Sequence, residues 1–142
     1  MQITVETLVR APLETVWACW TTPEDIMDWN AASEDWHTTR AEIDLVPGGR
    51  FLSRMEAKDG SAGFDFEGRF VRIEPLSMIE SEFGGRHLKV WFQTAPGGTL
   101  VREVFDPEDE HPAEIQRQGW QAILDNFARH VEAKVAAEPV SD

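Results

Sequence analysis

The feature that most constrains the fold is a single long amphipathic helix that follows a region of short strands. Over residues 113–136, apolar side chains recur with helical spacing on one face, and charged side chains occupy the opposite face. The segments before it predict strands joined by turns that are rich in glycine and proline. One helix, about 10–12 Å wide, cannot cover many strands spaced about 4.8 Å apart. The sheet must therefore curve around the helix, which predicts an α+β fold.

The N-terminal region adds one strand and two short helices. Residues 3–10 alternate between apolar and polar side chains, which is typical of a strand with one buried face. Pro12 predicts the start of a first helix, because proline is tolerated where the backbone N–H has no partner. Pro23 repeats this signal for a second helix that ends near Trp29. Asp25 is placed to complement the exposed N–H groups at its start.

The strands of the middle region follow one another through short hairpins, which predicts an antiparallel sheet. Glycine pairs and an Asp-Gly pair mark the tightest turns. Gly68 stands inside a strand and is a predicted bend point. Together with the first strand, seven strands result, over residues 3–10, 38–46, 50–57, 64–73, 77–83, 87–94 and 99–106.

Length and composition exclude several classes of protein. The 142 residues suit a single domain over residues 1–136, followed by a tail, residues 137–142, that we expect to fray. The net charge of −13 disfavours nucleic acid and membrane lipid as partners. Cys19 is the only cysteine, so no internal disulfide forms, and we expect a buried, inert thiol. The sequence shows no signal peptide and no membrane-spanning apolar run, so we expect a cytoplasmic protein.

Strand parity predicts an aromatic inner face of the sheet. Phe51, Ser53 and Met55 share one face of their strand, and three charged residues share the other face with Leu52. Ser53 and Ser81 share the inward parity and could each offer one hydroxyl. A curved sheet that grips one helix leaves a volume between them. Two interpretations stay open, namely an apolar pocket for a ligand or a core that the same aromatic side chains fill. The candidate ligand-binding residues are Trp17, Trp20, Trp36, Phe51, Met55, Phe66, Phe70, Phe83, Phe92, Trp120, Leu124 and Phe127.

Candidates for catalysis are few, and no catalytic residue is assigned. His37 comes at the start of a strand, where it could lie at the pocket mouth. On the last strand either Arg102 or Glu103 points inward, and the pattern leaves open which one. If Glu103 is inside, burial raises its pKa and makes it a candidate base, whereas outside it forms a surface ion pair. Residues 108–111 hold acids and a histidine, but consecutive loop residues rarely converge on one ion, so we expect no metal and no cofactor.

Several short motifs, taken in order, resemble those of one family. They are Arg-Ala-Pro-x-x-x-Val-Trp at 10–17, Thr-Pro-Glu at 22–24, Asp44 before Pro-Gly-Gly-Arg-Phe at 47–51, Asp-Gly at 59–60, Phe-Glu-Gly at 66–68, Ile-Glu-Pro at 73–75, and Gly119-Trp120 with Leu124. The chain is similar over residues 3–133 to the START-like, Bet v 1-like (SRPBCC) superfamily. Within it, the chain resembles the bacterial branch related to the C-terminal domain of the activator of Hsp90 ATPase. The resemblance implies a helix-grip fold whose cavity, in relatives, holds lipids, sterols, polyketides or other apolar molecules.

Three functions follow as hypotheses. The leading one is the binding of a small hydrophobic or aromatic molecule in the cavity, with no ligand assigned. The second is a cyclase- or hydrolase-type enzyme that acts on such a molecule, with His37 or Glu103 as acid or base. The third is a partner protein that modulates a chaperone ATPase, because the fold hosts all three roles in relatives. A homodimer is left open, since a sheet edge or the outer helix face could pair.

Overall fold

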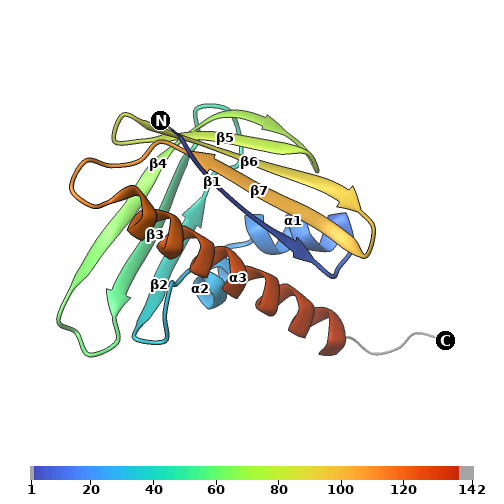
Figure 1. The fold of residues 1–142 in the computed structure, drawn as a ribbon, viewed down its shortest axis with the longest axis horizontal. Helices are drawn as coiled ribbons and strands as arrows, with labels where there is room; N and C mark the ends of the chain where they lie inside the picture. Colours follow the sequence, from blue (N-terminus) through green and yellow to red (C-terminus); the bar gives the residue numbers. More distant parts are fainter. Residues whose placement is uncertain (1, 138–142) are drawn as a thin grey trace.

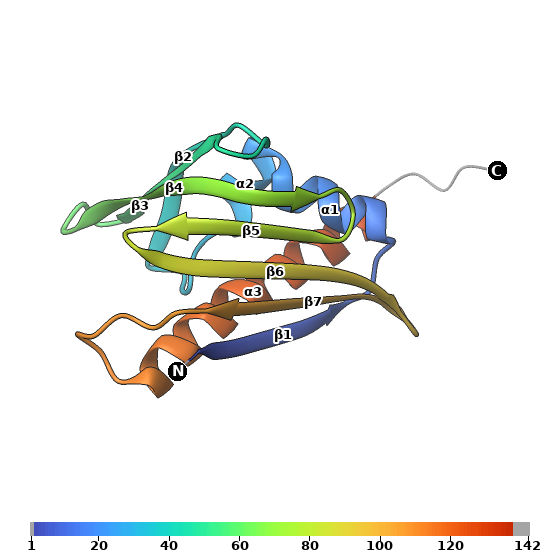
Figure 2. The same ribbon diagram turned by 90° about the horizontal axis from the view of Figure 1, so that it is seen from above.

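A seven-stranded antiparallel sheet wraps around one long helix in the computed structural model, which describes residues 2–137 (Figures 1 and 2). The predicted α+β helix-grip fold is confirmed, with its elements in the predicted order. The elements are β1 (Ile3–Val9), α1 (Leu13–Thr21), α2 (Pro23–Trp29), β2 (Trp36–Ile43), β3 (Arg50–Ala57), β4 (Gly63–Glu74), β5 (Met78–Phe83), β6 (Arg86–Ala95), β7 (Gly98–Phe105) and α3 (Ala113–Ala137).

The order of strands across the sheet is β1-β7-β6-β5-β4-β3-β2. From β2 to β7, each strand pairs antiparallel with its successor in the chain. Strand β1 instead pairs with β7, and Ile3 lies opposite Phe105. The two edges of the sheet are therefore β1 and β2, which α1 and α2 connect.

The sheet bends, and α3 crosses its concave face. Figure 1 shows β2, β3 and β4 turned steeply relative to β5, β6 and β7. Register shifts interrupt the ladders between Thr38 and Arg40 and between Phe70 and Arg72, and irregularities of this kind bend a strand locally. Helix α3 packs most extensively against β1, at one edge of the sheet. Space therefore remains between α3 and the strands near the opposite edge.

Two groups of aromatic side chains form much of the core. In the first, Trp20 stacks on Trp29 with ring centroids 4.9 Å apart, and both contact Phe127 of α3. In the second, Trp120 of α3 stacks on Phe105 of β7 at 4.0 Å. We call the first group the Trp20 cluster, comprising Trp17, Trp20, Trp29, Phe92 and Phe127. We call the second the Trp120 cluster, comprising Phe66, Phe83, Phe105 and Trp120.

Strand β2 differs most from the prediction, whereas most other elements begin or end within one residue of it. Strand β2 begins at Trp36 rather than at residue 38, because Trp36 pairs with Ala57 at the far end of the β2–β3 ladder. Helix α3 continues to Ala137, and residues 138–142 of the predicted tail lie outside the described residues. Within residues 2–137, none of the helices has both the length and the apolar character needed to cross a membrane.

Candidate ligand pocket

A pocket lies between the concave face of the sheet and α3, and side chains of α1 and α2 complete its wall. Its volume is about 450 Å³, within the range of small-molecule sites in proteins. The wall is mainly apolar and draws on both aromatic clusters. Its apolar side chains are Trp20, Ile26, Trp29, Ala32, Ile43, Phe51, Met55, Phe64, Phe66, Phe70, Ile79, Leu88, Val90, Ile115, Trp120 and Ile123.

The structure brings half of the predicted ligand-binding residues together in this wall. These are Trp20, Phe51, Met55, Phe66, Phe70 and Trp120. Four others fill the core, namely Phe83, Phe92, Leu124 and Phe127. Trp17 packs edge-on against Phe92 in the Trp20 cluster. Trp36 contacts Phe64, close to the pocket but outside its wall. An inward-facing position therefore leads to the pocket only where no neighbouring ring already covers it.

Several wall residues were not selected from the sequence. Helix α2 supplies Ile26 and Trp29, and β5 supplies Ile79. The signal for Ile79 was available, because it shares strand parity with Ser81, which was predicted to face inward. The signal for α2 was weaker, since its seven residues are too few to show a clear apolar face.

Glu103 is the inward residue of the pair that the sequence left open. Its side chain lies in the pocket wall and only 4% of the residue is exposed. Across the two ladders it faces Val5 of β1 and Val90 of β6, which are both buried. Arg102 points to the outer face, where its Nε donates to Glu6 at 2.8 Å. Because no residue within 2–137 offsets its burial, the pKa of the Glu103 carboxyl is raised from 4.5 to about 8.

The other polar residues in the pocket wall are Asn30, Glu42, Ser53, Ser81, Arg86, Glu108, His111 and Gln116. Ser53 and Ser81 are buried in the wall and each offers one hydroxyl, as strand parity predicted. Arg86 also lines the pocket, but its guanidinium is engaged elsewhere. Its Nε donates to the backbone carbonyl of Asp106 at 3.0 Å, and its Cζ lies 4.7 Å from the centre of the Phe83 ring.

Hydrogen bonds of the Gln116 side chain hold the loop between β7 and α3 against the helix at the pocket. The Gln116 side chain accepts from the backbone N–H of Glu108 at 2.8 Å and donates to the carbonyls of Glu108 and His111 at 3.0 and 2.8 Å. All three residues line the pocket.

His37 of β2, in contrast, lies opposite Glu56 of β3 and is absent from the pocket wall. The prediction that His37 lies at the mouth is therefore wrong, because odd and even residues of a strand point to opposite faces.

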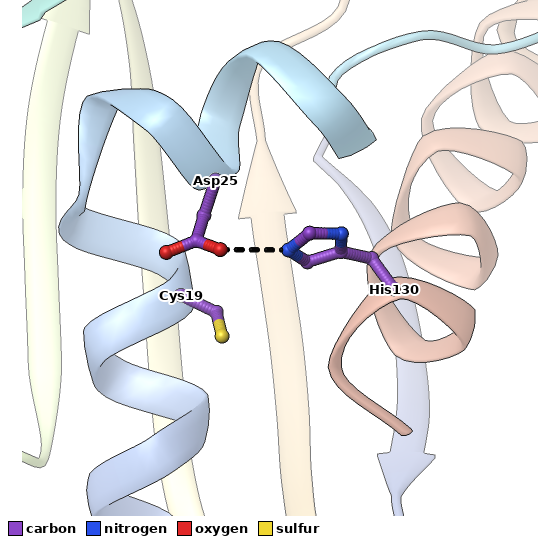
Figure 3. A group of neighbouring side chains, drawn as sticks. All are labelled: Cys19, Asp25 and His130. Carbon is purple, nitrogen blue, oxygen red and sulfur yellow. Dashed lines mark hydrogen bonds and ion pairs between the residues drawn. The ribbon is translucent and has the colours of Figure 1, made fainter. Parts of the chain in front are cut away.

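Asp25 joins α2 to α3 rather than serving only the start of α2. Its Oδ1 lies 2.9 Å from His130 Nε2 and 2.8 Å from Lys134 Nζ. Burial alone raises the pKa of Asp25, but hydrogen bonds from Lys134 and His130 outweigh it and hold the pKa below its usual range. Figure 3 shows Asp25, His130 and the buried Cys19 pointing toward one another from three helices.

Two groups of side chains bring metal-ligating atoms together within residues 2–137. The donor atoms of Cys19, Asp25 and His130 lie within 4.8 Å of one another, but Lys134 already occupies the Asp25 oxygen. The second group is formed by Glu108, Glu110 and His111 and is mainly exposed. Its donor atoms also lie within 4.8 Å of one another. These loop neighbours converge more than we expected. Exposed acids often do so without an ion, and the absence of a metal stays a prediction.

A second depression, of about 850 Å³, lies on the outer face of β1, β7 and β6. The Glu6–Arg102 ion pair lies in it, beside Trp91 and Gln121. Its charged side chains are already paired at the surface, and its lining is more polar than that of the inner pocket.

Comparison with known proteins agrees with this architecture. The family described as Activator of Hsp90 ATPase homolog 1-like protein matches residues 10–132. The solution structure of an AHSA1-like protein from Aeromonas hydrophila superposes with a TM-score of 0.92 at 48% identity, covering 100% of this chain and 99% of that one. A solution structure from Cytophaga hutchinsonii gives a TM-score of 0.80 at 40% identity, covering 99% of each chain. None of the curated proteins matches.

A more distant structure shows the fold alone. A crystal structure of a protein from Chromobacterium violaceum has a TM-score of 0.83 at 24% identity, covering 93% of this chain and 98% of that chain. The family match and the shared fold therefore both extend over nearly the whole chain.

Proposed function

The chain belongs to the Activator of Hsp90 ATPase homolog 1-like family, within the START-like, Bet v 1-like group, and on that premise we propose that it binds a small hydrophobic or aromatic molecule. The observation that supports this proposal is the pocket of about 450 Å³ with its mainly apolar wall. A wall atom that faces open space lacks the packing contacts of a filled core. An apolar ligand would restore those contacts and lose its own exposed area, so its burial is favourable.

A neutral fluorescent dye tests the proposal directly. N-phenyl-1-naphthylamine is apolar and uncharged near neutral pH, so the negative protein does not repel it. We expect saturable binding of one dye per chain, with quenching of tryptophan fluorescence because Trp20 and Trp120 lie in the wall. Titration followed by both signals should give the same dissociation constant.

Blocking variants locate the dye. Ser81 is buried in the wall, so Ser81→Phe places a ring inside the pocket and should weaken dye binding about tenfold or more. Ser53→Phe supplies an independent block from β3 should the first variant fail to fold. Glu82→Phe is the matched control, because Glu82 is the next residue of β5 and is exposed. If all three variants bind the dye as tightly as the unchanged protein does, the dye lies elsewhere and the proposal is refuted.

The enzyme hypothesis keeps one of its two candidate residues. Glu103 lies in the pocket with a pKa near neutrality, which suits a general base. His37 is on the outer face, and no second acid or base contacts Glu103 within residues 2–137. A cyclase- or hydrolase-type reaction would then depend on Glu103 alone, and Glu103→Gln should abolish any activity found.

The remaining roles rest on less of the structure. The family description mentions an ATPase activator, so modulation of a chaperone ATPase stays an alternative that an ATPase assay with added protein can exclude. Strands β1 and β2 are the two edges of the sheet, through which a homodimer could form. Sedimentation would decide that question. We retain the cytoplasm as the proposed location.

A further inference from the structure

Glu103 is a buried carboxyl that no described residue satisfies. Among residues 2–137 it makes no hydrogen bond and no ion pair, and its raised pKa has burial as its one cause. No side-chain oxygen or nitrogen of these residues is both sealed from solvent and unpaired. Since Glu103 is unpaired and only 4% exposed, its oxygens must reach the one open space beside it, which is the pocket.

An unpaired polar group in an apolar setting costs stability, so it calls for an explanation. Among the described residues, no charged side chain pairs with it. The facing residues of β1 and β6 are Val5 and Val90, and α3 presents Trp120 and Ile123 to the same pocket. The other charged or titratable wall residues are Glu42, Arg86, Glu108 and His111. Of these, Arg86 is held by Asp106 and the Phe83 ring, and His111 Nδ1 lies 2.6 Å from Glu108.

We propose that the pocket selects an apolar ligand that carries one basic nitrogen, and that the Glu103 carboxylate pairs with the resulting cation. This inference rests on the proposed binding function and adds the ligand's chemical class. The aromatic wall, which includes Trp20, Trp29 and Trp120, suits both an apolar body and a cation, because ring faces attract positive charge. A net charge of −13 draws cations and repels anionic ligands such as fatty acids.

The pairing predicts a characteristic pH dependence. Burial raises the pKa of the Glu103 carboxyl to about 8, so below that pH the ligand-free protein carries a proton on this group. A protonated amine must displace that proton to form the ion pair. Its affinity should therefore rise with pH between about pH 6 and about pH 8, by up to about tenfold per pH unit. A ligand without charge should show no such slope.

Three probes with one hydrocarbon body test the inference by calorimetry on the full chain. They are 2-naphthylmethylamine, 2-naphthalenemethanol and 2-naphthoic acid. At about pH 8 we expect the amine to bind about tenfold or more tightly than the alcohol, and the acid to bind most weakly. Glu103→Gln should reduce the affinity of the amine to that which the alcohol has for the same variant, and it should remove the pH slope. Glu82→Gln, an exposed substitution on the outer face of β5, is the control.

The outcomes separate this inference from the proposed function. If the alcohol binds and the amine binds no more tightly, the inference fails while the pocket remains a binding site. A pH slope that persists in Glu103→Gln would assign the titration to another wall group and overturn the inference. So would an affinity that falls with pH, because it would make Glu103 a neutral hydrogen-bond donor. If neither amine nor alcohol binds, both proposals fail.

Discussion

Glu103 destabilises the fold when it is ionised, because its carboxyl is buried, and in our proposal the same carboxylate binds the ligand. The sequence reduced the question to Glu103 or Arg102, because neighbours on a strand point to opposite faces. It could not decide between them, since the register depends on the pairing of β7 with β1, almost a hundred positions away along the chain. The structure places the arginine with Glu6 at the surface and the glutamate in the pocket.

The cost of Glu103 should be visible in the pH dependence of stability. In the unfolded chain this carboxyl ionises near its ordinary pKa of 4.5, whereas in the fold the pKa is about 8. Its contribution is therefore fully present below pH 4.5 and is lost as pH rises toward 8, at about 1.4 kcal/mol per pH unit. Glu103→Gln should remove this slope. Urea unfolding at about pH 5 and about pH 8 measures it, and parallel curves for both proteins would contradict the burial of the carboxyl.

Asp25 contributes to the pH dependence of stability in the opposite direction, because its pKa is lowered rather than raised. Its pKa is held below 3.8, so its stabilising contribution is present above that value and is lost as pH falls through the folded-state pKa. Asp25→Asn leaves His130 and Lys134 without their anion and should cost about 2 kcal/mol at neutral pH. Asp28→Asn is the control, because Asp28 is an exposed residue of the same helix. Thermal unfolding of the two variants compares them, and equal losses would mean that the Asp25 contacts contribute nothing specific.

At the scale of elements, the sequence predicts all strands and helices in order, because each is strongly patterned and bounded by turn or loop signals. What it cannot predict is how the elements lie against one another. Helix α3 is offset toward the β1 edge, and its Trp120 packs on Phe83, while Trp17 and Trp20 of α1 pack on Phe92. Phe66 and Phe70 line the pocket. Such an offset results from the packing of all the side chains together and has no local signal.

Gly68 of β4 is needed for close packing rather than as a free hinge. A Cβ atom at this position would lie 2.2 Å from the carbonyl oxygen of Glu82 and 2.8 Å from the Phe51 ring. Gly68→Ala should therefore displace Phe51, which lines the pocket, and cost about 1–3 kcal/mol.

Gly119 provides the contrasting control for Gly68. A Cβ atom on this residue of α3 meets nothing within 4 Å, so Gly119→Ala should stabilise the helix by about 0.5–1 kcal/mol. Denaturant midpoints of the two variants give the comparison. Equal effects would show that close packing at Gly68 is not the deciding factor.

At the scale of the whole molecule, the order in which the chain connects its strands matters as much as the curved shape of the sheet. The sequence predicted a curved sheet that grips a helix, and the structure agrees. Whether the enclosed volume stays open could not be predicted, since fourteen large aromatic side chains could equally fill it. They leave room because most of them gather in the Trp20 and Trp120 clusters.

The pairing of β1 with β7 has a consequence for how the chain folds. Strands β2 to β7 can form by successive local zipping, whereas Ile3 must wait for Phe105, and closing so long a loop is entropically expensive. We expect β1 to dock after the rate-limiting step. Val9→Ala in β1 should therefore mainly accelerate unfolding, with a φ-value of about 0–0.3, and Val90→Ala in β6 should mainly slow folding. Stopped-flow chevrons distinguish them, and a high φ-value at Val9 would mean that the two chain-distant strands meet early.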